Sequence, residues 1–422
     1  MKQLLKELHA QVEALETEMI TIRRDLHRHP ELSFEEVRTP AMIADFLEGL
    51  GLEVRRNVGG RGVVGTLKGG KPGKTIALRA DFDALPIHDE KEVEYRSTVP
   101  GVMHACGHDG HTAALLGTAK ALAKYRDQLP GTIVFIHQFA EELAPGGARP
   151  MIEDGCLDGV DVIYGCHLQS TMPFGNVYYR EGYIQAAADK FTIKVTGKGG
   201  HGAIPHETVD PIIIGSQIAL NLQTIASRRV DPLKQLVVSI GAFHAGDAFN
   251  VIPESAELTG TVRSYDPQVR DMAEQTLIKI ATTVAEANDA VAKVHYERGY
   301  DALYNHPEET RIAQQALANV DGVQEVVETP PVMPGEDFSY YTQKVPGSFF
   351  FTGAQMQNPS DIYPHHNARF DFDERAMAIS AKGFCSIILA YQQKYMSEAE
   401  ESTRSPAADQ YSPASVKDEQ FS

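Results

Sequence analysis

Apolar segments typical of β-strands alternate with segments typical of helices along the first half of this 422-residue chain, and this alternation constrains the fold most strongly. Strands joined by helices run parallel to one another, and strands this apolar are covered on both faces of their sheet. The sequence therefore predicts an α/β fold with a mostly parallel sheet. The predicted strands are 75–83, 131–140 and 160–168, and the helices between them are 111–125 and 146–155.

Polar side chains occur where each of these three strands ends. Asp81 and Asp83 close the first strand, Glu141 and Glu142 follow the second, and His167 closes the third. The carboxyl ends of parallel strands lie at one edge of a sheet, and open α/β sheets carry their sites there. We therefore expect these five side chains to lie close together.

The pattern changes at about residue 187, where the chain begins to follow a β-α-β-β-α-β order. This order is typical of a small antiparallel sheet with helices on one face, as in ferredoxin-like domains. A segment rich in Ser, Glu, Ala and Pro ends the chain and predicts disorder. The expected organisation is a catalytic domain in two parts (1–186 and 299–396), an inserted lid or dimerisation domain (187–298) and a disordered tail (397–422).

Further elements are predicted near the two ends of the catalytic domain. Apolar residues from Leu5 to Leu26 recur at steps of three and four, which predicts one apolar helix face packed on the domain. Near the other end, a strand is expected at 347–354 and a last helix at about 373–395.

Composition and charge exclude several classes of protein. The formal net charge of −18 argues against nucleic acid as a partner, because phosphate binding requires a basic face. No apolar run reaches the ~20 residues of a membrane span, and the N-terminus lacks the apolar core of a secretory signal. Four cysteines are too few for a disulfide framework. We expect a cytoplasmic protein without a membrane partner.

The segment MHACGHDGHT (103–112) raises the question of what Cys106 does. A disulfide requires an oxidising compartment, and a nucleophilic cysteine requires a histidine base and an orienting group. A metal site requires converging donors, which His108, the glutamate pair, His167 and the doublet HH at 365–366 offer. Such a donor set suits zinc, manganese, cobalt or nickel. The residues favour a metal ligand and leave a structural residue or a nucleophile open.

The adjacent glutamates are candidates for two separate tasks. Neighbouring side chains at a strand end point in different directions, so one of them can bind metal while the other acts as a base. A base of moderate pKa is needed to take a proton from water and pass it to a leaving amine. The alternative interpretation is a solvated acidic turn.

Eight segments, which span roughly residues 15–395, resemble the motifs of one family in the same order. The family is the aminoacylase, hippurate hydrolase and indole-acetyl-amino-acid hydrolase branch of the dinuclear metallo-carboxypeptidases and aminoacylases. The resemblance implies hydrolysis of N-acyl-L-amino acids, two divalent metal ions in a large domain, and an inserted domain used for dimerisation or closure. The segments are MHACGHDGHT, RADFDALPI, AEE, GCHL, GGHGAIPH, NVIPESAELTGTVR, GEDFSYY and HHNARFDFDE.

The resemblance also implies roles for individual residues of the large domain. It makes Glu141 the general base and Asp83 an acidic residue near the metals. His365 is left out of the ligand set, and four further histidines are interpreted as structural: His27, His29, His104 and His111. The implied metal ligands are Cys106, His108, Glu142, His167 and His366, with Cys106 as a thiolate ligand that bridges the two ions.

The inserted domain and the motif after it supply the implied substrate contacts. His201, in a Gly-rich loop, is expected to reach into the cleft and polarise the scissile carbonyl, with Asn250 nearby. Arg263 is expected to hold the carboxylate of the substrate, and Gly335 is expected to line the substrate site. A small-molecule substrate and a homodimer or higher homo-oligomer follow from the same resemblance.

Some residues depart from the family pattern, and other functions remain open. The departures are Phe139, Leu143-Ala144-Pro145, Pro334 and Ala368, which border the expected acyl or leaving-group pockets. A carboxypeptidase or dipeptidase would share the same site. A cysteine amidase that uses Cys106 and a catalytically silent binding protein are the alternatives from other classes.

Overall fold

The computed structural model describes the backbone of residues 1–404 and the side chains of residues 1–396. The large domain is built on an eight-stranded sheet of order β1-β2-β4-β3-β5-β16-β6-β15. Its four central strands, β4, β3, β5 and β16, are parallel, and antiparallel pairs lie toward both ends. The predicted mixed α/β class is confirmed. The strands are β1 (Glu53–Val58), β2 (Gly62–Lys68), β3 (Lys71–Asp81), β4 (Pro130–Gln138), β5 (Val162–Gln169), β6 (Asn176–Tyr179), β15 (Glu325–Glu328) and β16 (Gly347–Gly353).

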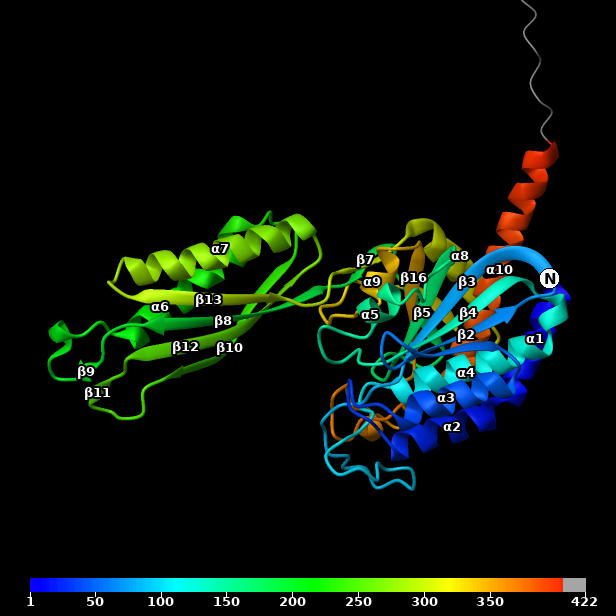
Figure 1. Ribbon diagram of the computed structural model, residues 1–422, viewed down its shortest axis with the longest axis horizontal. Coiled ribbons are helices and arrows are strands. Elements are labelled where there is room, and N and C mark those ends of the chain that lie inside the picture. The colour runs from blue at the N-terminus through cyan, green and yellow to red at the C-terminus, as the bar shows by residue number, and fades with distance from the viewer. Residues whose placement is uncertain (405–422) are drawn as a thin grey trace, which may run out of the picture.

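Helices cover the large sheet (Figure 1). Helix α4 packs against β3, α2 and α10, and α10 also packs against β3, β5 and β16. Residues Ile76–Asp81 of β3 are all buried, as expected for a strand covered on both faces. The helices of this domain are α1 (Lys2–Ala14), α2 (Glu16–Arg28), α3 (Arg38–Gly49), α4 (His108–Lys124), α5 (Ala148–Glu153), α8 (Pro307–Leu317), α9 (Ser339–Thr342) and α10 (Ala376–Arg404), with short 3-10 turns at Arg126–Gln128 and Pro359–Asp361.

The register of the central strands aligns their carboxyl ends. Asp81 of β3 pairs with Gln138 of β4, Arg79 of β3 pairs with Gly165 of β5, and Phe351 of β16 pairs with His167. The turns that follow β3, β4 and β5 therefore leave the sheet at one edge, which is where the predicted polar side chains lie.

The inserted domain is a separate antiparallel sheet of order β10-β12-β8-β13. Helices α6 and α7 pack on one of its faces around a second apolar core that includes Phe191, Leu258 and Leu277. This is the ferredoxin-like arrangement, and Figure 1 shows it extending away from the large domain. Its elements are β8 (Ala187–Thr196), β9 (Gly200–His201), a 3-10 turn (Pro205–Glu207), α6 (Pro211–Thr224), a π-helical turn (Ile225–Arg229), β10 (Leu236–Ala245), β11 (Val251–Ile252), β12 (Ser255–Ser264), α7 (Pro267–Glu286) and β13 (Val291–Arg298).

Buried charge fixes the junction of the two domains. Arg270 of α7 forms ion pairs with Asp189 of β8 and with Asp301, which follows β13. Both connections between the domains are thereby tied to one helix. A small two-stranded sheet of β7 (Gly182–Gln185) and β14 (Leu303–Asn305) lies on the large-domain side of these connections.

Three details differ from the sequence-based expectations or add to them. The predicted N-terminal helix is interrupted at Leu15, whose N–H bonds to the carbonyl of Val12 three residues earlier, although its apolar face is buried as expected. Helix α10 continues to Arg404, beyond its predicted end at about residue 395, and residues 405–422 of the predicted disordered tail lie outside the described residues. Within the described part of the chain, no helix is long and apolar enough to cross a membrane.

Candidate metal centre

The loop that carries Cys106 and His108 enters helix α4 through a tight turn. Gly107 has φ +95°, a conformation that favours glycine, and it separates the two candidate ligands. His108 is the first residue of α4, and Asp109 follows it on a different side of the helix. The Asp109 carboxylate accepts hydrogen bonds from Arg23 and pairs with His27, so a buried ion network anchors the start of the helix. This anchor fixes the direction of the ligand loop.

Two groups of potential ligand atoms share the Cys106 sulfur. In each group the ligand atoms lie within 4.8 Å of one another. One group is Cys106, His108 and His167, and the other is Cys106, Glu142 and His366. Individual distances are 3.5 Å from Cys106 Sγ to His167 Nε2 and 3.3 Å from His366 Nε2 to Glu142 Oε2. The predicted ligand residues therefore converge, with Cys106 between two neighbouring positions.

Two of the candidate donor atoms are buried without a hydrogen-bond partner among the described residues, as expected of atoms that bind metal ions. His108 contacts Asp83 through Nδ1, which leaves Nε2 buried without a hydrogen-bond partner, and Glu142 Oε1 is also buried and unpartnered. His167 donates Nδ1–H to the carbonyl of Leu168 at 2.8 Å, so its Nε2 lone pair faces Cys106. Buried polar atoms without partners are rare, and ligating histidines usually donate their other N–H in this way. The donor set fits two divalent cations.

The thiol of Cys106 is not set up as a free nucleophile. Burial raises its pKa well above the ordinary value, and the carboxylates of Glu142 and Glu141 add to this rise. Reactive cysteines have lowered pKa values in electropositive surroundings. A cation bound at Cys106 would favour the thiolate, whereas these acidic surroundings alone favour the neutral thiol.

Glu141 lies between the ligand groups and two further acids. Its side chain is buried, and burial raises its pKa well above the ordinary value, with Glu336 the next cause. Its main-chain carbonyl accepts a hydrogen bond from the hydroxyl of Tyr300, a residue of the connection to the inserted domain. Ligand atoms of Glu141, Glu336 and Asp337 lie within 4.8 Å of one another. This position suits a carboxylate that accepts and releases a proton beside bound metals.

A buried arginine network beneath Glu141 was not assigned any role from the sequence. Arg79 of β3 donates to Asp81 at 2.7 Å and to Asp337 at 3.0 Å, and it lies 3.1 Å from Glu336. Burial raises the pKa of Glu336 to about 8 and that of Asp337 to about 6. These residues belong to the motifs RADFD and GEDF. The sequence feature that could have indicated the network is Arg79 itself, a charged residue inside an apolar strand. The network holds the strand ends that carry the site.

Asp83 contacts two of the candidate ligand residues, His108 and Glu142. Its Oδ1 lies 3.1 Å from His108 Nδ1, and its Oδ2 accepts the N–H of Glu142 and the hydroxyl of Ser33. Its carboxylate is in none of the ligand-atom groups found among the described residues. Its contacts therefore suit orientation of His108 and Glu142.

Among the four histidines interpreted as structural, His111 contacts the carboxyl ends of two strands, β3 and β5, that carry the site. It pairs with Asp81 at 2.6 Å and accepts the N–H of Leu168 at 2.9 Å, so it joins the ends of β3 and β5.

The two histidines of the HH doublet take different positions. His366 has φ +63°, and its N–H bonds to the carbonyl of Ala105, which brings its ring to Glu142. The ring of His365 lies 5.1 Å from that of His167 and 4.9 Å from that of Phe370. His366, and not His365, belongs to a ligand group, as the sequence resemblance implied.

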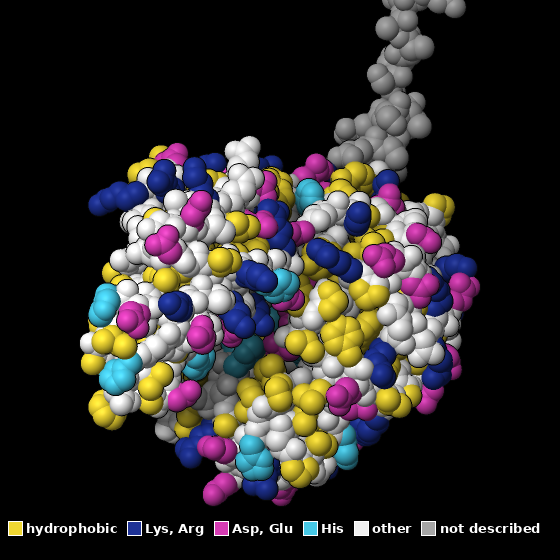
Figure 2. All heavy atoms as spheres, turned by 60° about the vertical axis from the view of Figure 1, so that its left-hand side comes forward, with side chains coloured by type: hydrophobic (Ala, Val, Ile, Leu, Met, Phe, Trp, Pro, Cys, Tyr) yellow, Lys and Arg dark blue, Asp and Glu magenta, His cyan; other side chains and the backbone are white. Residues whose placement is uncertain are grey.

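The predicted substrate contacts lie apart from one another. His201 of β9 and Asn250 before β11 are exposed at the end of the inserted domain farthest from the large domain (Figure 1). Arg263 of β12 lies at the other end of that sheet, paired with Ala188, which in turn lies against Gly335. Figure 2 shows a hollow at the centre of one face, with Lys and Arg side chains along its edge. Within one chain, the structure brings Arg263 and Gly335 toward the large domain but leaves His201 and Asn250 remote.

Comparisons with known proteins agree with this geometry. Residues 77–390 match the model of peptidase family M20/M25/M40. An N-acyl-L-amino acid amidohydrolase of Geobacillus stearothermophilus is 46% identical over 304 residues, which cover 72% of this chain and 82% of the relative. Thermostable carboxypeptidase 2 of Saccharolobus solfataricus is 43% identical over 394 residues, which cover 93% and 100%.

A solved structure adds evidence on the metals. The crystal structure of the YXEP protein of Bacillus subtilis, described as a dinuclear metal binding peptidase of the M20 family, superposes with a TM-score of 0.77 at 36% identity. The match covers 90% of this chain and 99% of that one. Fold, ligand groups and relatives together define a metal-dependent hydrolase of amide bonds. The chain belongs to peptidase family M20/M25/M40, which confirms the family resemblance of its motifs.

Substitution of the shared sulfur tests the metal centre. Cys106→Ser should weaken metal binding by ~10–100-fold or more, because a hydroxyl is a poor substitute for a thiolate ligand. Losing a residue that only hydrogen-bonds to a ligand typically costs this much already. Metal affinity is measured by competition with a chromophoric chelator, with Cys156→Ser as a matched control outside the ligand groups. Wild-type affinity in Cys106→Ser, or activity that survives metal removal but not alkylation, would favour a cysteine amidase instead.

Proposed function

We propose that this protein hydrolyses N-acyl-L-amino acids to a carboxylic acid and an amino acid. The observation that carries the proposal is the pair of ligand groups that share Cys106, with the buried Glu141 directly beside them. The relative named N-acyl-L-amino acid amidohydrolase supports the substrate class. The runner-up is a carboxypeptidase or dipeptidase at the same site, which the relative named carboxypeptidase keeps open.

Cys106, His108, Glu142, His167 and His366 would hold the two metal ions, since Cys106 belongs to both ligand groups. Zinc, manganese, cobalt and nickel all suit sulfur, imidazole and carboxylate donors. When bound, such ions supply Lewis acidity that polarises an amide carbonyl and lowers the pKa of water.

The residues of the chain provide the proton transfer. Glu141 accepts a proton from the attacking water and delivers it to the nitrogen of the departing amine. Asp83 holds His108 and the N–H of Glu142, so it keeps a ligand beside the base. Water adds to the acyl carbon, the C–N bond breaks, and the products are a carboxylate and an amino acid.

Arg263 is the proposed partner of the substrate carboxylate. Its guanidinium donates to the Thr261 hydroxyl and to the carbonyl of Val262, and the described residues give it no ion pair with a carboxylate. Burial lowers its pKa from the ordinary value, which indicates that its charge lacks full compensation. Because the protein carries a net charge of −18, an anionic substrate requires such a local cation. Gly335, close to Ala188 beside this arginine, is proposed to line the same part of the cleft.

The remote position of His201 suggests that a second copy of the chain completes the site. Several large apolar side chains of the inserted domain are exposed, which is typical of an interaction surface. They include Ile204, Ile213, Leu220, Leu233, Phe249 and Val251. We propose a homodimer formed through this domain, in which His201 and Asn250 of one copy reach the cleft of the other and polarise the scissile carbonyl.

The free cysteines support the expected compartment. All four thiols are unpaired, as in a reducing environment, and we propose the cytoplasm as the location. Fractionation of native cells tests this; recovery from an oxidising compartment would contradict it.

A substrate panel tests the function and the role of Arg263 together. Acetyl, benzoyl and aminoacyl derivatives of one amino acid are assayed, each as the free acid and as the amide. Wild type should prefer N-acyl free acids. Arg263→Ala should lower kcat/KM for these acids by ~10²-fold or more, as expected for a charge-assisted contact, and should affect the amides far less.

Two outcomes would contradict these assignments. Preference for the aminoacyl derivatives would favour the peptidase function. Equal losses for acids and amides in metal-matched Arg263→Ala would show that the arginine supports structure and that the carboxylate is held elsewhere.

The two adjacent glutamates should separate by function. Glu141→Gln should keep both metals and lower kcat by the ~10²–10⁴-fold typical of a lost general base. Glu142→Gln should lose metal, because an amide oxygen is a weaker ligand than a carboxylate. Metal content by mass spectrometry and kcat are measured on the same samples. Equal metal loss in both variants would contradict the division of roles.

Mixed dimers test the contribution of the second copy. His201→Ala and Glu141→Gln should each be nearly inactive alone. Random exchange makes half of the dimers mixed, each with one intact site, so about a quarter of wild-type activity should return. Two copies of Glu141→Gln in differently tagged chains serve as the control. No recovery in dimers shown to be mixed would place His201 in the site of its own chain.

A further inference from the structure

The connection between α2 and α3 lies against both turns that carry the acidic site residues. Its main chain pairs with the turn after β3, where Leu32 bridges to Ala84 and the carbonyl of Glu31 accepts the N–H of Ala84. Its Ser33 hydroxyl donates to Asp83 at 2.6 Å. We call residues 31–36 the support segment. The sequence assigns no role to this segment.

The support segment also reaches the turn after β4. Glu36, whose side chain is fully buried, accepts the main-chain N–H of Ala140 through Oε1 at 2.9 Å. The ring of Phe34 packs edge-on against that of Phe139, with centroids 5.7 Å apart. Residues 139 and 140 directly precede the glutamate pair, so the segment contacts the base of this turn in two places.

The conformation of Ala140 shows why a support is needed. Its φ is +50°, in the left-handed region that residues with a Cβ rarely adopt. This backbone turn sets the directions in which Glu141 and Glu142 leave the chain. A strained conformation persists only where neighbouring groups hold it, and the hydrogen bond from Ala140 to Glu36 is such a contact.

Two carboxylates bracket Glu141. Glu36 holds the N–H of the residue before it, and Asp83 holds the N–H of the residue after it, at 3.0 Å. Ser33 fixes the second of these carboxylates. The main chain on both sides of Glu141 is therefore held from the support segment, one side directly and the other through Asp83.

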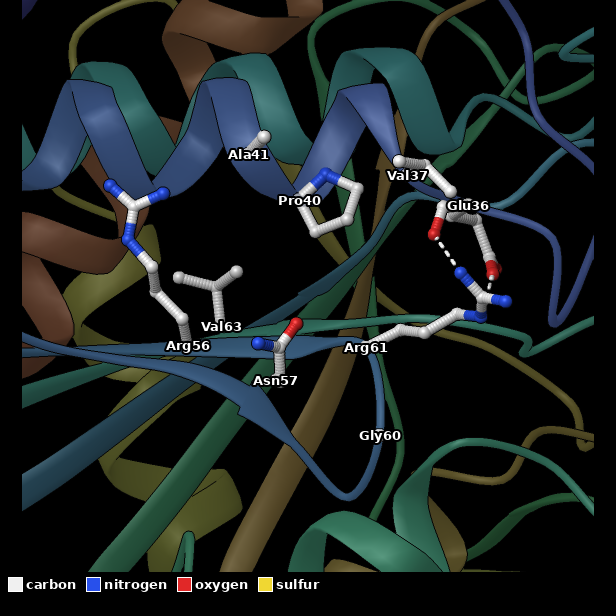
Figure 3. A pocket seen from close by; sticks show the side chains of 9 residues that line it. All are labelled: Glu36, Val37, Pro40, Ala41, Arg56, Asn57, Gly60, Arg61 and Val63. Carbon is white, nitrogen blue, oxygen red and sulfur yellow. Dashed lines mark hydrogen bonds and ion pairs between the residues drawn. The ribbon is translucent and has the colours of Figure 1, made fainter.

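The environment of Glu36 makes it a costly residue for packing alone. Its Oε2 has no hydrogen-bond partner, and the nearest cationic nitrogen, Arg61 Nε, is 4.0 Å away (Figure 3). Burial raises the pKa of Glu36 to about 8, and the nearby Asp83 contributes to the rise. Burying a carboxyl with an unpartnered oxygen is unfavourable, so an apolar residue would serve the core better.

We propose that Glu36 is a positioning residue, which holds the N–H of Ala140 and thereby directs Glu141 toward the reacting groups and Glu142 toward the metals. This inference rests on the roles given to the two glutamates in the proposed function. Glu36 positions the turn through the oxygen that accepts the N–H of Ala140, and not through its negative charge.

Two substitutions of Glu36 separate these effects. Glu36→Gln keeps an acceptor for Ala140 and should stay within ~3-fold of wild type in kcat and metal affinity. Glu36→Leu removes the acceptor and should lower kcat by ~10–100-fold with little change in KM, as expected when a catalytic group shifts by about 1 Å. Its metal affinity should also fall, which is measured by chelator competition without substrate.

Glu31 provides a matched control in the same segment. Its carboxylate accepts the N–H groups of Val37, Arg38 and Thr39 at the start of α3 and does not contact the turn after β4. Glu31→Gln should leave kcat and metal affinity unchanged. If Glu36→Leu does not fold, Glu36→Met replaces it, and the same losses of kcat and metal affinity are expected because a thioether is a poor acceptor for the N–H of Ala140.

Three results would overturn the proposal. The first is wild-type kcat and metal affinity in Glu36→Leu, or in Glu36→Met where it replaces that variant. The second is equal impairment of Glu36→Gln and Glu36→Leu, and the third is an equal loss in Glu31→Gln. All kinetics use whichever amide the wild type cleaves best. A failure of the N-acyl amino acid assignment therefore leaves this test intact, and the two failures are distinguishable.

Discussion

The parallel register of β4, β3 and β5 is the constraint on which the site depends. It places the ends of three strands at one edge, so that turns more than 20 residues apart in the chain converge. Cys106 and His108 come to the same edge because α4 begins there and packs back along β3. The site is thus a property of the sheet edge, and each turn contributes one or two groups to it.

The same edge must bury an unusual amount of charge. Arg23 faces Asp109, Asp371 and Glu374, and Arg79 faces three further carboxylates beneath Glu141. Buried charges are tolerated only when they are paired and hydrogen-bonded, and the excess here is negative. Divalent cations at the ligand groups would offset that excess, which gives the acidic surroundings of Cys106 and Glu141 a physical reason.

The two domains divide the chemistry between them. The large domain holds the candidate ligands and the candidate general base, while the inserted domain supplies the candidate groups that recognise substrate. Tyr300 connects the two parts, because it belongs to the junction and its hydroxyl bonds to the carbonyl of Glu141. The Arg270 ion pairs fix the same junction from the side of the inserted domain.

The sequence pattern alone was sufficient for the α/β class and the inserted ferredoxin-like unit, because apolar strand patterns and strand-end polar residues are local properties that a chain displays directly. The choice of Cys106, His108, Glu142, His167 and His366 came from the family resemblance of the motifs, and the structure brings the ligand atoms of these residues together. Helix α10 was extended beyond its predicted end, since polar composition does not prevent a helix from continuing.

Tertiary structure alone decided how the groups are held. The left-handed turn at Ala140, the contact of Glu36 with it, the burial of Arg79 among acids, and the distance of His201 from the metal centre all depend on which segments pack together. Such contacts join residues that lie tens to hundreds of positions apart in the chain, and no local pattern records them. The sequence by itself determined which chemical groups the protein has and to which sheet edge they belong, and only the folded chain determined where each group points.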